Sequence, residues 1–240
     1  MNTAIVMGVG PLPGLGAHLA RRFARRGLNV FVAGRSADKL DAVAAAIRAE
    51  GGTATAVVAD TTDEAAVNQV FARAVGAGRL ECALYNAGNN TPGRIVDMAA
   101  DYFEQSWRIG CFGGFLFGRA ALRAMLPHQA GTILYTGASA SLRGRPNFGA
   151  FASAKGALRA FAQSLAKEAG PLGIHVGHVI VDGVIDGEKI RTRAPDYVAT
   201  LTEADMIALD AIADGFEFLH DQPSRGWSFE LDLRTAKETW

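Results

Sequence analysis

The sequence predicts one α/β domain in which a doubly wound parallel sheet carries helices on both faces. Apolar runs of strand length alternate along the 240 residues with longer, Ala- and Arg-rich amphipathic segments, which is the pattern of repeated β-α units. Several of the runs are apolar nearly throughout, as expected for parallel strands that are buried on both faces. No internal repeat, low-complexity tract or linker interrupts this alternation. We therefore expect residues 1–240 to form a single domain.

Each predicted strand is a short apolar run, and each predicted helix is a longer segment between two such runs. The strands are expected at residues 3–7, 29–33, 54–59, 82–86, 131–136, 175–181 and 227–231. The helices are expected at residues 15–26, 36–50, 64–77, 100–126 and 151–169. Ser36 and Thr62 stand at favoured N-cap positions, and Gly27, Gly51 and Gly170 stand where helices should end. Right-handed crossovers between such units place a ligand beyond the carboxyl ends of the strands.

The segment at residues 186–201 departs from this alternation, because it is polar and shows no clear period. The pattern that follows predicts a helix at residues 202–220, opened by a near capping box at Thr202. A long irregular stretch beyond the carboxyl end of a strand is more often a substrate loop than a plain connection. We therefore expect residues 186–220 to form a substrate loop and helix within the domain.

Composition limits the possible partners. The formal net charge is zero, which gives no electrostatic case for nucleic acid or an anionic membrane surface as partner. No apolar run is expected to approach the roughly 18–20 residues of a membrane span. Two cysteines are too few for a disulfide framework or a zinc site, so no metal is predicted. The expected compartment is the cytoplasm.

Glycines crowd the first turn, between the predicted strand at residues 3–7 and the following helix. They are Gly8, Gly10, Gly14 and Gly16, and Leu15 opens the helix. Glycine lets the backbone turn tightly and approach a pyrophosphate, whose negative charge the helix N-terminus favours. This turn is therefore a candidate dinucleotide-binding loop, although a tight strand-to-helix turn uses glycine without any ligand as well.

The ends of the next strands suggest which dinucleotide is bound. Arg35 follows the second strand, where an acidic residue would receive the adenosine ribose and an arginine would pair with a 2′-phosphate. Arg35 favours NADP(H) over NAD(H), which stays possible; on its own it could be a solvated residue at a helix start. Asp60 and Thr61 follow the third strand, where the aspartate could meet the adenine edge or cap a helix.

The fourth strand runs into Asn86, Ala87 and Gly88. A turn of small residues at a strand's carboxyl end suits close approach to a nicotinamide ribose. In the alternative interpretation, Asn86 ties neighbouring strands together through side-chain hydrogen bonds. The two roles are compatible.

Together, these motifs resemble the short-chain dehydrogenase/reductase family over essentially the whole chain. The spacing of Gly10, Gly14 and Gly16 is similar to the family's glycine loop, although Gly8 can take the first place with two inserted residues. The resemblance implies a Rossmann-type fold and a homodimer or homotetramer joined through the helices at residues 100–126 and 151–169. It also implies cofactor contacts later in the chain, at Lys155 for the nicotinamide ribose and near Gly183 and Ile185 for the carboxamide.

The departures from the family all fall in its catalytic set. Phe151 stands where the family has its tyrosine, four residues before Lys155, and a phenyl ring has no O–H to donate. Gly110 stands at the position of the asparagine. The serine position falls on Ala138, and a one-residue adjustment brings Ser139 there. Ser139 could then hydrogen-bond a carbonyl oxygen, and Lys155 could move the proton itself if its pKa were lowered.

Three functions remain after this comparison. The first is an NADP(H)-dependent oxidoreductase with an altered proton path, which reduces a carbonyl or an activated alkene of a small apolar compound. Tyr197, in the substrate loop, is the one tyrosine placed to swing over such a site. The alternative is a catalytically impaired NADP(H)-binding protein that acts as a sensor or oligomer partner. Non-redox catalysis in the same site is a third hypothesis.

Overall fold

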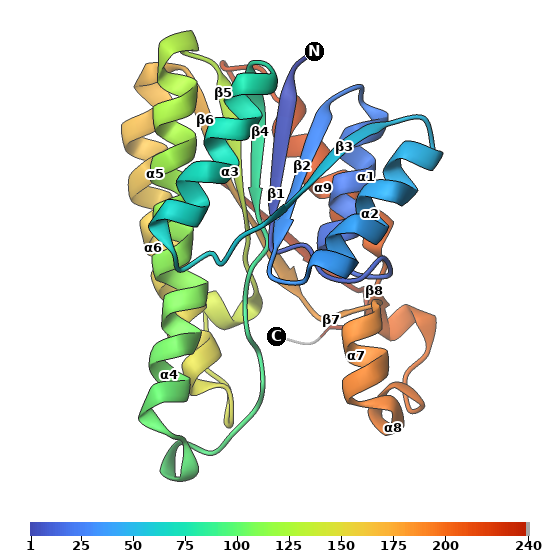
Figure 1. Ribbon diagram of the computed structural model, residues 1–240. Helices are drawn as coiled ribbons and strands as arrows, with labels where there is room; N and C mark the ends of the chain where they lie inside the picture. The colour runs from blue at the N-terminus through green and yellow to red at the C-terminus, as the bar shows by residue number, and fades with distance from the viewer. Residues whose placement is uncertain (239–240) are drawn as a thin grey trace.

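The computed structural model describes residues 1–238, and its centre is a parallel sheet of seven strands (Figure 1). The strand order is β3-β2-β1-β4-β5-β6-β9. The strands are β1 (Thr3–Met7), β2 (Asn29–Gly34), β3 (Thr53–Val58), β4 (Leu80–Tyr85), β5 (Gly131–Thr136), β6 (Ile174–Asp182) and β9 (Glu230–Arg234). The order reverses between β1 and β4, which makes their carboxyl ends the topological switch point where ligands bind in open α/β sheets.

Helices cover both faces of the sheet, as the alternating pattern predicts. One buried cluster joins the sheet to α1 (Leu15–Arg25), α2 (Ala37–Ala49) and α9 (Leu209–Asp221). The other joins it to α3 (Glu64–Ala77), α5 (Gly113–Met125) and α6 (Gly149–Ala169). The strands between these two clusters are buried on both sides, which explains their nearly continuous apolar sequences. The predicted doubly wound single-domain α/β fold is confirmed.

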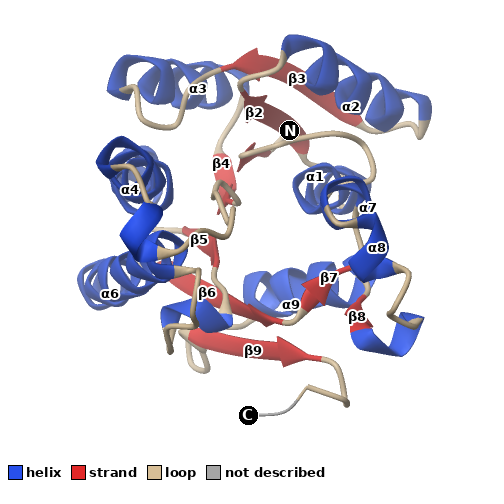
Figure 2. Cartoon of the chain, turned by 90° about the horizontal axis from the view of Figure 1, so that it is seen from below, coloured by secondary structure: helices blue, strands red, loops and turns tan. Residues whose placement is uncertain are grey.

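The carboxyl ends of the strands carry the remaining short elements. Figure 2 looks onto this edge, with α4 (Ala100–Trp107) and α6 on one side. On the other side lie α7 (Glu188–Arg193) and α8 (Pro195–Val198). A small two-stranded parallel sheet, β7 (Val184–Ile185) with β8 (Met206–Ile207), connects this second side to the end of β6.

The substrate segment is more regular than its sequence suggests. Residues 186–201, expected to be irregular, contain the helices α7 and α8. The helix expected at residues 202–220 does not begin at Thr202: the capping box there closes a single 3₁₀ turn, Glu203–Asp205, and β8 follows before α9 begins at Leu209. β8 consists of Met206 and Ile207, two apolar residues that the sequence assigned to a helix and that pair with β7 instead.

Ser36 is the N-cap residue of α2, as predicted, but makes no side-chain capping hydrogen bond. The predicted N-cap Thr62 is wrong by one residue: Asp63 caps α3 by accepting hydrogen bonds from the backbone N–H groups of the second and third helical residues. Gly170 follows the last residue of α6, as predicted, and opens a 3₁₀ turn that ends at the left-handed Gly173, with φ of 78°. The last strand also lies three residues later than predicted, because residues 227–229 run towards the sheet before pairing begins.

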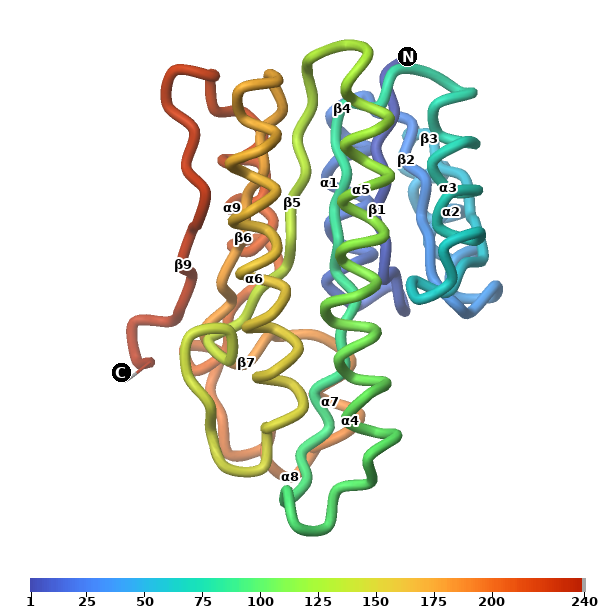
Figure 3. The backbone as a smooth tube through the Cα atoms, turned by 90° about the vertical axis from the view of Figure 1, so that its left-hand side faces the viewer, coloured from blue at the N-terminus to red at the C-terminus, as the bar shows by residue number. Residues whose placement is uncertain are grey.

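The predicted helix at residues 100–126 is one continuous rod in Figure 3, made of α4, a π-helical stretch at Arg108–Phe112, and α5. Contrary to expectation, the helical segment Ala100–His128 is long and apolar enough to meet the criteria for a membrane span, with a mean hydropathy of 1.3. Its apolar composition has another cause in this fold. More than half of that window is buried, and Leu116 and Phe117 pack into the core beneath the sheet.

Candidate active site

The first turn closes tightly on the end of β4, and Gly8 makes this possible. Gly8 follows β1 directly with φ of +90°, and a Cβ there would lie 2.5 Å from the backbone nitrogen of Ala87. A Cβ on Gly10 would meet nothing within 4 Å. Backbone contacts therefore require glycine at position 8 and not at position 10. This favours Gly8 as the first glycine of the loop, with two residues inserted after it.

The second half of the loop brings the N-terminus of α1 to the same place. Gly14 precedes α1, and its N–H donates to the Pro11 carbonyl at 3.0 Å. Leu15 begins the helix and is buried. A Cβ on Gly16 would lie 2.9 Å from the Gly8 carbonyl oxygen, so the loop and helix pack backbone to backbone. The helix N–H groups that remain unbonded thus lie at the switch point, where an anion is favoured.

Asn86 ties three strands together at this edge. Its N–H donates to the Met7 carbonyl of β1 at 2.8 Å, and its side-chain amide donates to Gly8 at 3.4 Å. Thr136, at the end of β5, donates its hydroxyl proton to the Asn86 Oδ1 at 3.0 Å. The interpretation of Asn86 as a tie between strands is confirmed, and a contact of Asn86, Ala87 and Gly88 with a ribose stays a prediction.

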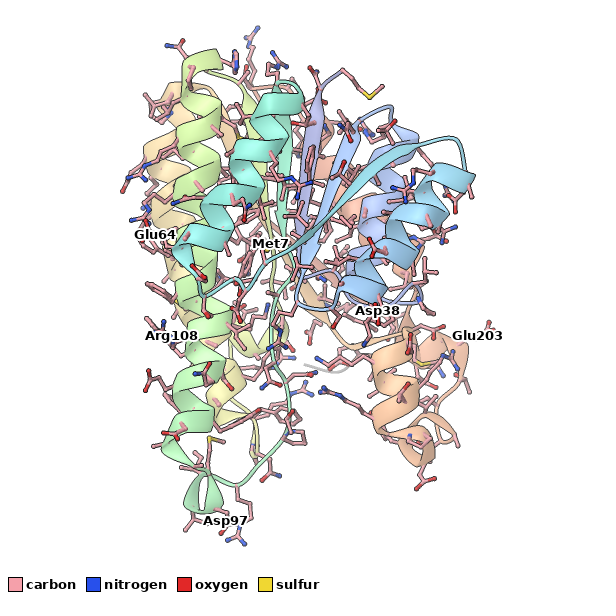
Figure 4. The ribbon with its side chains drawn as sticks, viewed as in Figure 1. Met7, Asp38, Glu64, Asp97, Arg108 and Glu203 are labelled. Carbon is pink, nitrogen blue, oxygen red and sulfur yellow. The ribbon has the colours of Figure 1, made fainter. Side chains whose placement is uncertain are left out.

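The expected adenosine end is built from the carboxyl ends of β2 and β3. Arg35 follows Gly34 and is exposed. Asp60 accepts two hydrogen bonds of 2.8 Å from Thr62, from its N–H and its hydroxyl. Burial raises the pKa of Asp60. The two hydrogen bonds and the charges of Arg35 and Arg108 together outweigh that effect, so the pKa falls below its usual value. The charges of Arg35 and Arg108 therefore both act on the Asp60 carboxylate. Arg108 is labelled in Figure 4.

Arg108 had no role in the sequence prediction. It opens the π-helical stretch, with its guanidinium 5.0 Å from the ring centre of Phe112. Thr61, beside Asp60, is buried against the backbone at Gly113, where a Cβ would lie 2.8 Å from the Thr61 carbonyl. Only the fold brings residues 60 and 108 together, so no local pattern could have indicated the pair.

Lys155 is the buried charged group of the site. Its side chain is 5% exposed, and its Nζ donates a hydrogen bond of 2.6 Å to the Thr136 carbonyl at the end of β5. A Cβ on Gly88 would lie 3.5 Å from the same nitrogen, so the amine lies next to the turn after β4. Burial, and after it the charge of Lys189, lower the pKa of Lys155 to about 8. An amine with this pKa can release or accept a proton near neutral pH.

Phe151 lies one helical turn before Lys155, in the first turn of α6. The Nζ of Lys155 is 6.0 Å from the centre of the Phe151 ring, at the limit of a cation–π contact. The ring thus lies near this amine but has no O–H to donate. Phe151 and Lys155 lie four residues apart on the same helix, as predicted, and that Phe151 stands at the position of the family tyrosine stays a prediction.

Ser139, which the resemblance places at or next to the serine position, lies on a 3₁₀ turn, Ser139–Ser141, that packs against α6. Ser141 donates its hydroxyl proton to the Ala138 carbonyl at 2.7 Å. The Ser139 hydroxyl makes no hydrogen bond within residues 1–238. Of the two, Ser139 is therefore the one whose hydroxyl remains available to a ligand.

Gly110 has no room for a larger side chain. It lies in the π-helical stretch, and a Cβ there would come within 2.6 Å of the Ala154 Cβ on α6. The backbone one residue earlier is also engaged, since the Ile109 carbonyl accepts the Tyr85 hydroxyl at 2.5 Å. Glycine at position 110 is thus part of a close contact between two helices, and that it replaces the family asparagine stays a prediction.

The segment after β6 returns to the glycine loop. Gly183 follows β6, and Ile185 lies in β7, where it pairs with Ile207. Further on, the Glu188 N–H at the start of α7 donates to the Pro13 carbonyl at 3.1 Å. The substrate segment is therefore attached to the cofactor loop. Tyr197, expected to be able to swing over the site, lies on α8 at the far tip of this segment and is half exposed (Figure 1).

The other candidate groups have structural partners. His178 in β6 is fully buried, and its Nδ1 lies 3.0 Å from Glu230, which also accepts two hydrogen bonds from Arg159. His178 is therefore a hydrogen-bonded core residue. A cavity of about 400 Å³ lined by Lys167, Trp227 and their neighbours lies at the other end of α6 from Lys155.

The chain matches the family model described as short chain dehydrogenase over residues 2–196. A solved short-chain dehydrogenase from Rhodopseudomonas palustris is 36% identical with a TM-score of 0.83, and the match covers 97% of this chain and 98% of that one. A versicolorin reductase of Emericella nidulans is 29% identical over 200 residues, 82% of this chain and 74% of the relative. Actinorhodin polyketide ketoreductase, solved as a variant with NADPH, is 21% identical with a TM-score of 0.86 over 97% and 95% of the two chains. That last likeness is one of fold alone.

Proposed function

The chain belongs to the short-chain dehydrogenase family, and we propose that it is an NADP(H)-dependent oxidoreductase whose proton donor is Lys155. The proposed reaction is reduction of a carbonyl group, or of an activated double bond, in a small apolar compound. The observation that carries the proposal is the buried amine of Lys155, which is held at the end of β5 and has a pKa that burial lowers to about 8.

The residues at the switch point fit a dinucleotide. A pyrophosphate would lie at the N-terminus of α1, where Gly8 and Gly16 keep side chains out of the loop. Arg35 would pair with the 2′-phosphate of NADP(H), and without that phosphate NAD(H) would bind more weakly. Lys155 would hold the nicotinamide ribose, as the family resemblance implies.

Bound NADPH would supply a hydride, and this chain would supply the proton. As hydride is added to carbon and the electron pair of the double bond moves to oxygen, Lys155 would transfer a proton from Nζ to that oxygen and would then take a proton from solvent. Ser139 can donate a hydrogen bond to the same oxygen. An activated alkene suits this site well, because solvent can protonate its carbanion after the hydride has been transferred.

The experiment that tests this function has two stages. Fluorescence titration measures the affinity of the protein for NADPH and NADH, and loss of absorbance with a panel of ketones and enones then measures turnover. We expect tighter binding of NADPH, reversed in Arg35→Asp, and slow turnover of at least one enone. Failure to bind either nucleotide would overturn the cofactor assignment.

A second candidate function is a catalytically impaired NADP(H)-binding protein. It is favoured by the absence of any side-chain proton donor at Phe151 and Gly110. The same titration separates the two functions, because tight NADPH binding without turnover of any compound in the panel supports the sensor or oligomer-partner role.

We further propose that the chain works in the cytoplasm as a homodimer or homotetramer. Support for assembly comes from the partly buried aromatic rings on the outer side of α5 and α6, where Phe115 stacks edge-on against Phe161 with centroids 5.8 Å apart. Light scattering of the purified protein measures the mass that checks this assignment.

A further inference from the structure

The segment Thr235–Glu238, which we call the strap, follows β9 and connects the two sides of the carboxyl edge. The Nζ of Lys237 lies 2.9 Å from a carboxylate oxygen of Asp205, on the side of α7 and α8. The carboxylate of Glu238 accepts a hydrogen bond of 3.2 Å from the guanidinium of Arg145, on the side of α4 and α6. Two consecutive residues of the strap thus bind opposite sides of the site.

Both partners of the strap belong to segments that carry proposed site residues. Arg145 lies midway along the chain between Ser139 and Phe151, on the loop that leads into α6. Asp205 directly precedes β8, which pairs with β7 next to Gly183. The chain turns back beyond the end of β9, the edge strand of the sheet (Figure 2). The strap therefore ties the two segments together on the β9 side of the site.

The two ion pairs of the strap are exposed, in contrast to the ion pair at the base of the same loop. Arg143 lies 3.1 Å from Asp182 at the end of β6, and the side chain of Asp182 is 2% exposed. The side chains of Arg145 and Lys237 are each 54% exposed. An exposed ion pair shifts an equilibrium by only about 1.5- to 5-fold, and salt weakens it. The strap can therefore detach while the base of the loop stays in place.

We propose that the strap closes the β9 side of the active site, and that Lys237 and Glu238 thereby limit the size of the substrate that enters. A compound with one ring reaches the site while the strap is attached, whereas a larger compound enters only when both ion pairs open. Together the two pairs favour the attached state by about 2- to 25-fold, so the strap still opens often. The substrate part of this inference rests on the proposed oxidoreductase function, and the closure does not.

The first experiment needs neither cofactor nor turnover. Ser139→Cys places a thiol in the site, and peptide mass spectrometry measures the rates at which it reacts with N-methylmaleimide and with N-(1-pyrenyl)maleimide. Both reagents are neutral and carry the same reactive group. The ratio of the two rates therefore reports access by size and cancels any change in the reactivity of the thiol. The buried Cys82 and Cys111 are followed separately in their own peptides.

In this background, Arg145→Glu and Glu238→Arg should each raise the ratio of the pyrenyl to the methyl rate by about fivefold, because each replaces an attraction by a repulsion. The double variant restores the ion pair in reverse and should return the ratio to that of the parent. The matched control is Arg25→Glu at the far end of α1, since Arg25 is also 54% exposed and lies 3.1 Å from Glu50. A ratio that does not rise in the single variants, or that stays raised in the double variant, would overturn the closure.

Salt provides an independent check on the same ratio. Sodium chloride at 1 M shortens the screening length to about 3 Å, so it should raise the ratio in the parent. The double variant of Lys237→Gln and Glu238→Gln has already lost both ion pairs and should show no further rise. A parent whose ratio ignores salt would contradict closure by ion pairs.

Turnover supplies the last readout. The enones 2-cyclohexenone, with one ring, and chalcone, with two, are compared as substrates with NADPH. We expect Glu238→Arg to raise kcat/KM for chalcone by about fivefold and to leave kcat/KM for 2-cyclohexenone unchanged. Equal changes for the two enones would contradict selection by size. If the parent turns over neither enone, nor any other compound in the panel, the proposed function fails, and the maleimide ratio still decides whether the strap closes the site.

Discussion

The glycine-loop side of the site and the Lys155 side share one sheet edge but differ in what holds them in place. On the glycine-loop side the constraints are on the backbone: Gly8 and Gly16 leave no space for a Cβ, and Asn86 ties β1, β4 and β5. On the Lys155 side the constraints are on side chains, with Phe151 facing the amine and Gly110 pressed against α6.

This difference shows which parts of such a site can change independently. A backbone turn that closes on a neighbouring strand tolerates few substitutions, because several contacts depend on it. A side chain that enters the site from a helix can lose a hydroxyl while the helix keeps its packing. In the proposed function, Lys155 keeps its place beside residues 110 and 151, neither of which has a side-chain proton donor, and the proton therefore comes from the amine.

The largest expected effect comes from breaking the backbone side. Gly8→Ala should destabilise the protein by about 3 kcal/mol or more, because it combines a left-handed φ with a contact that is too close. NADPH affinity should fall with it. Gly10→Ala is the matched control, since its Cβ meets nothing within 4 Å. Denaturant unfolding and NADPH titration measure the two variants, and equal losses in both would contradict the importance of Gly8.

The next effect comes from adding a proton donor on the other side. Phe151→Tyr adds an O–H at the edge of a ring whose centre lies 6.0 Å from the Lys155 amine. A positioned acid contributes about 10²–10⁴-fold, and we expect about 10²-fold in kcat for carbonyl reduction, since Gly110 supplies no amide beside it. Stopped-flow absorbance of NADPH measures it. Phe148→Tyr, just before α6, is the control and should leave the rate unchanged.

Much of the backbone side could be predicted from the sequence. Glycines after an apolar run, and Arg35 after the next one, are local patterns, and local patterns indicate strand-to-helix turns directly. The doubly wound fold followed from the same alternation of apolar runs and amphipathic segments. The position of Phe151 relative to Lys155 was also readable, because residues four apart share one face of a helix.

The rest depended on contacts between distant segments. Nothing near Gly110 indicates that Ala154 fills the space beside it, and nothing near Lys189 indicates that its charge reaches Lys155. The pairing of β7 with β8 was missed for a similar reason. Two residues are enough for a short strand when a partner is present, but they are too few to show a strand period.

A third prediction tests how tightly Gly110 packs against Ala154 on α6. Gly110→Ala gains helix propensity, but its Cβ would lie 2.6 Å from that of Ala154, and overpacking of this kind costs about 1–3 kcal/mol. Adding Ala154→Gly removes the overlap. A double-mutant cycle by urea unfolding should therefore give a coupling energy of about 2 kcal/mol between the two positions. Additive losses would mean that the helices simply move apart, and the asparagine could then be restored at little cost.

The smallest effect, and the one that changes sign, concerns the stability cost of Lys155. Burial lowers its pKa from 10.5 to about 8, so between these values the unfolded chain binds more protons than the native one, and stability rises with pH. Below pH 8 the buried charge costs about 3 kcal/mol, which exceeds the about 1–2 kcal/mol gained from the hydrogen bond to Thr136.

Lys155→Met should therefore be more stable than the parent by about 1 kcal/mol at pH 6.5, since it removes the buried charge. Near pH 10.5 that charge has gone from the native parent, only the loss of the hydrogen bond remains, and the same variant should be less stable than the parent. Urea unfolding at both pH values measures the difference, with the exposed Lys167→Met as the control that shows no reversal. A variant that is less stable than the parent at both pH values would mean that burial does not lower the pKa of Lys155, and an amine with an ordinary pKa would not release a proton readily near neutral pH.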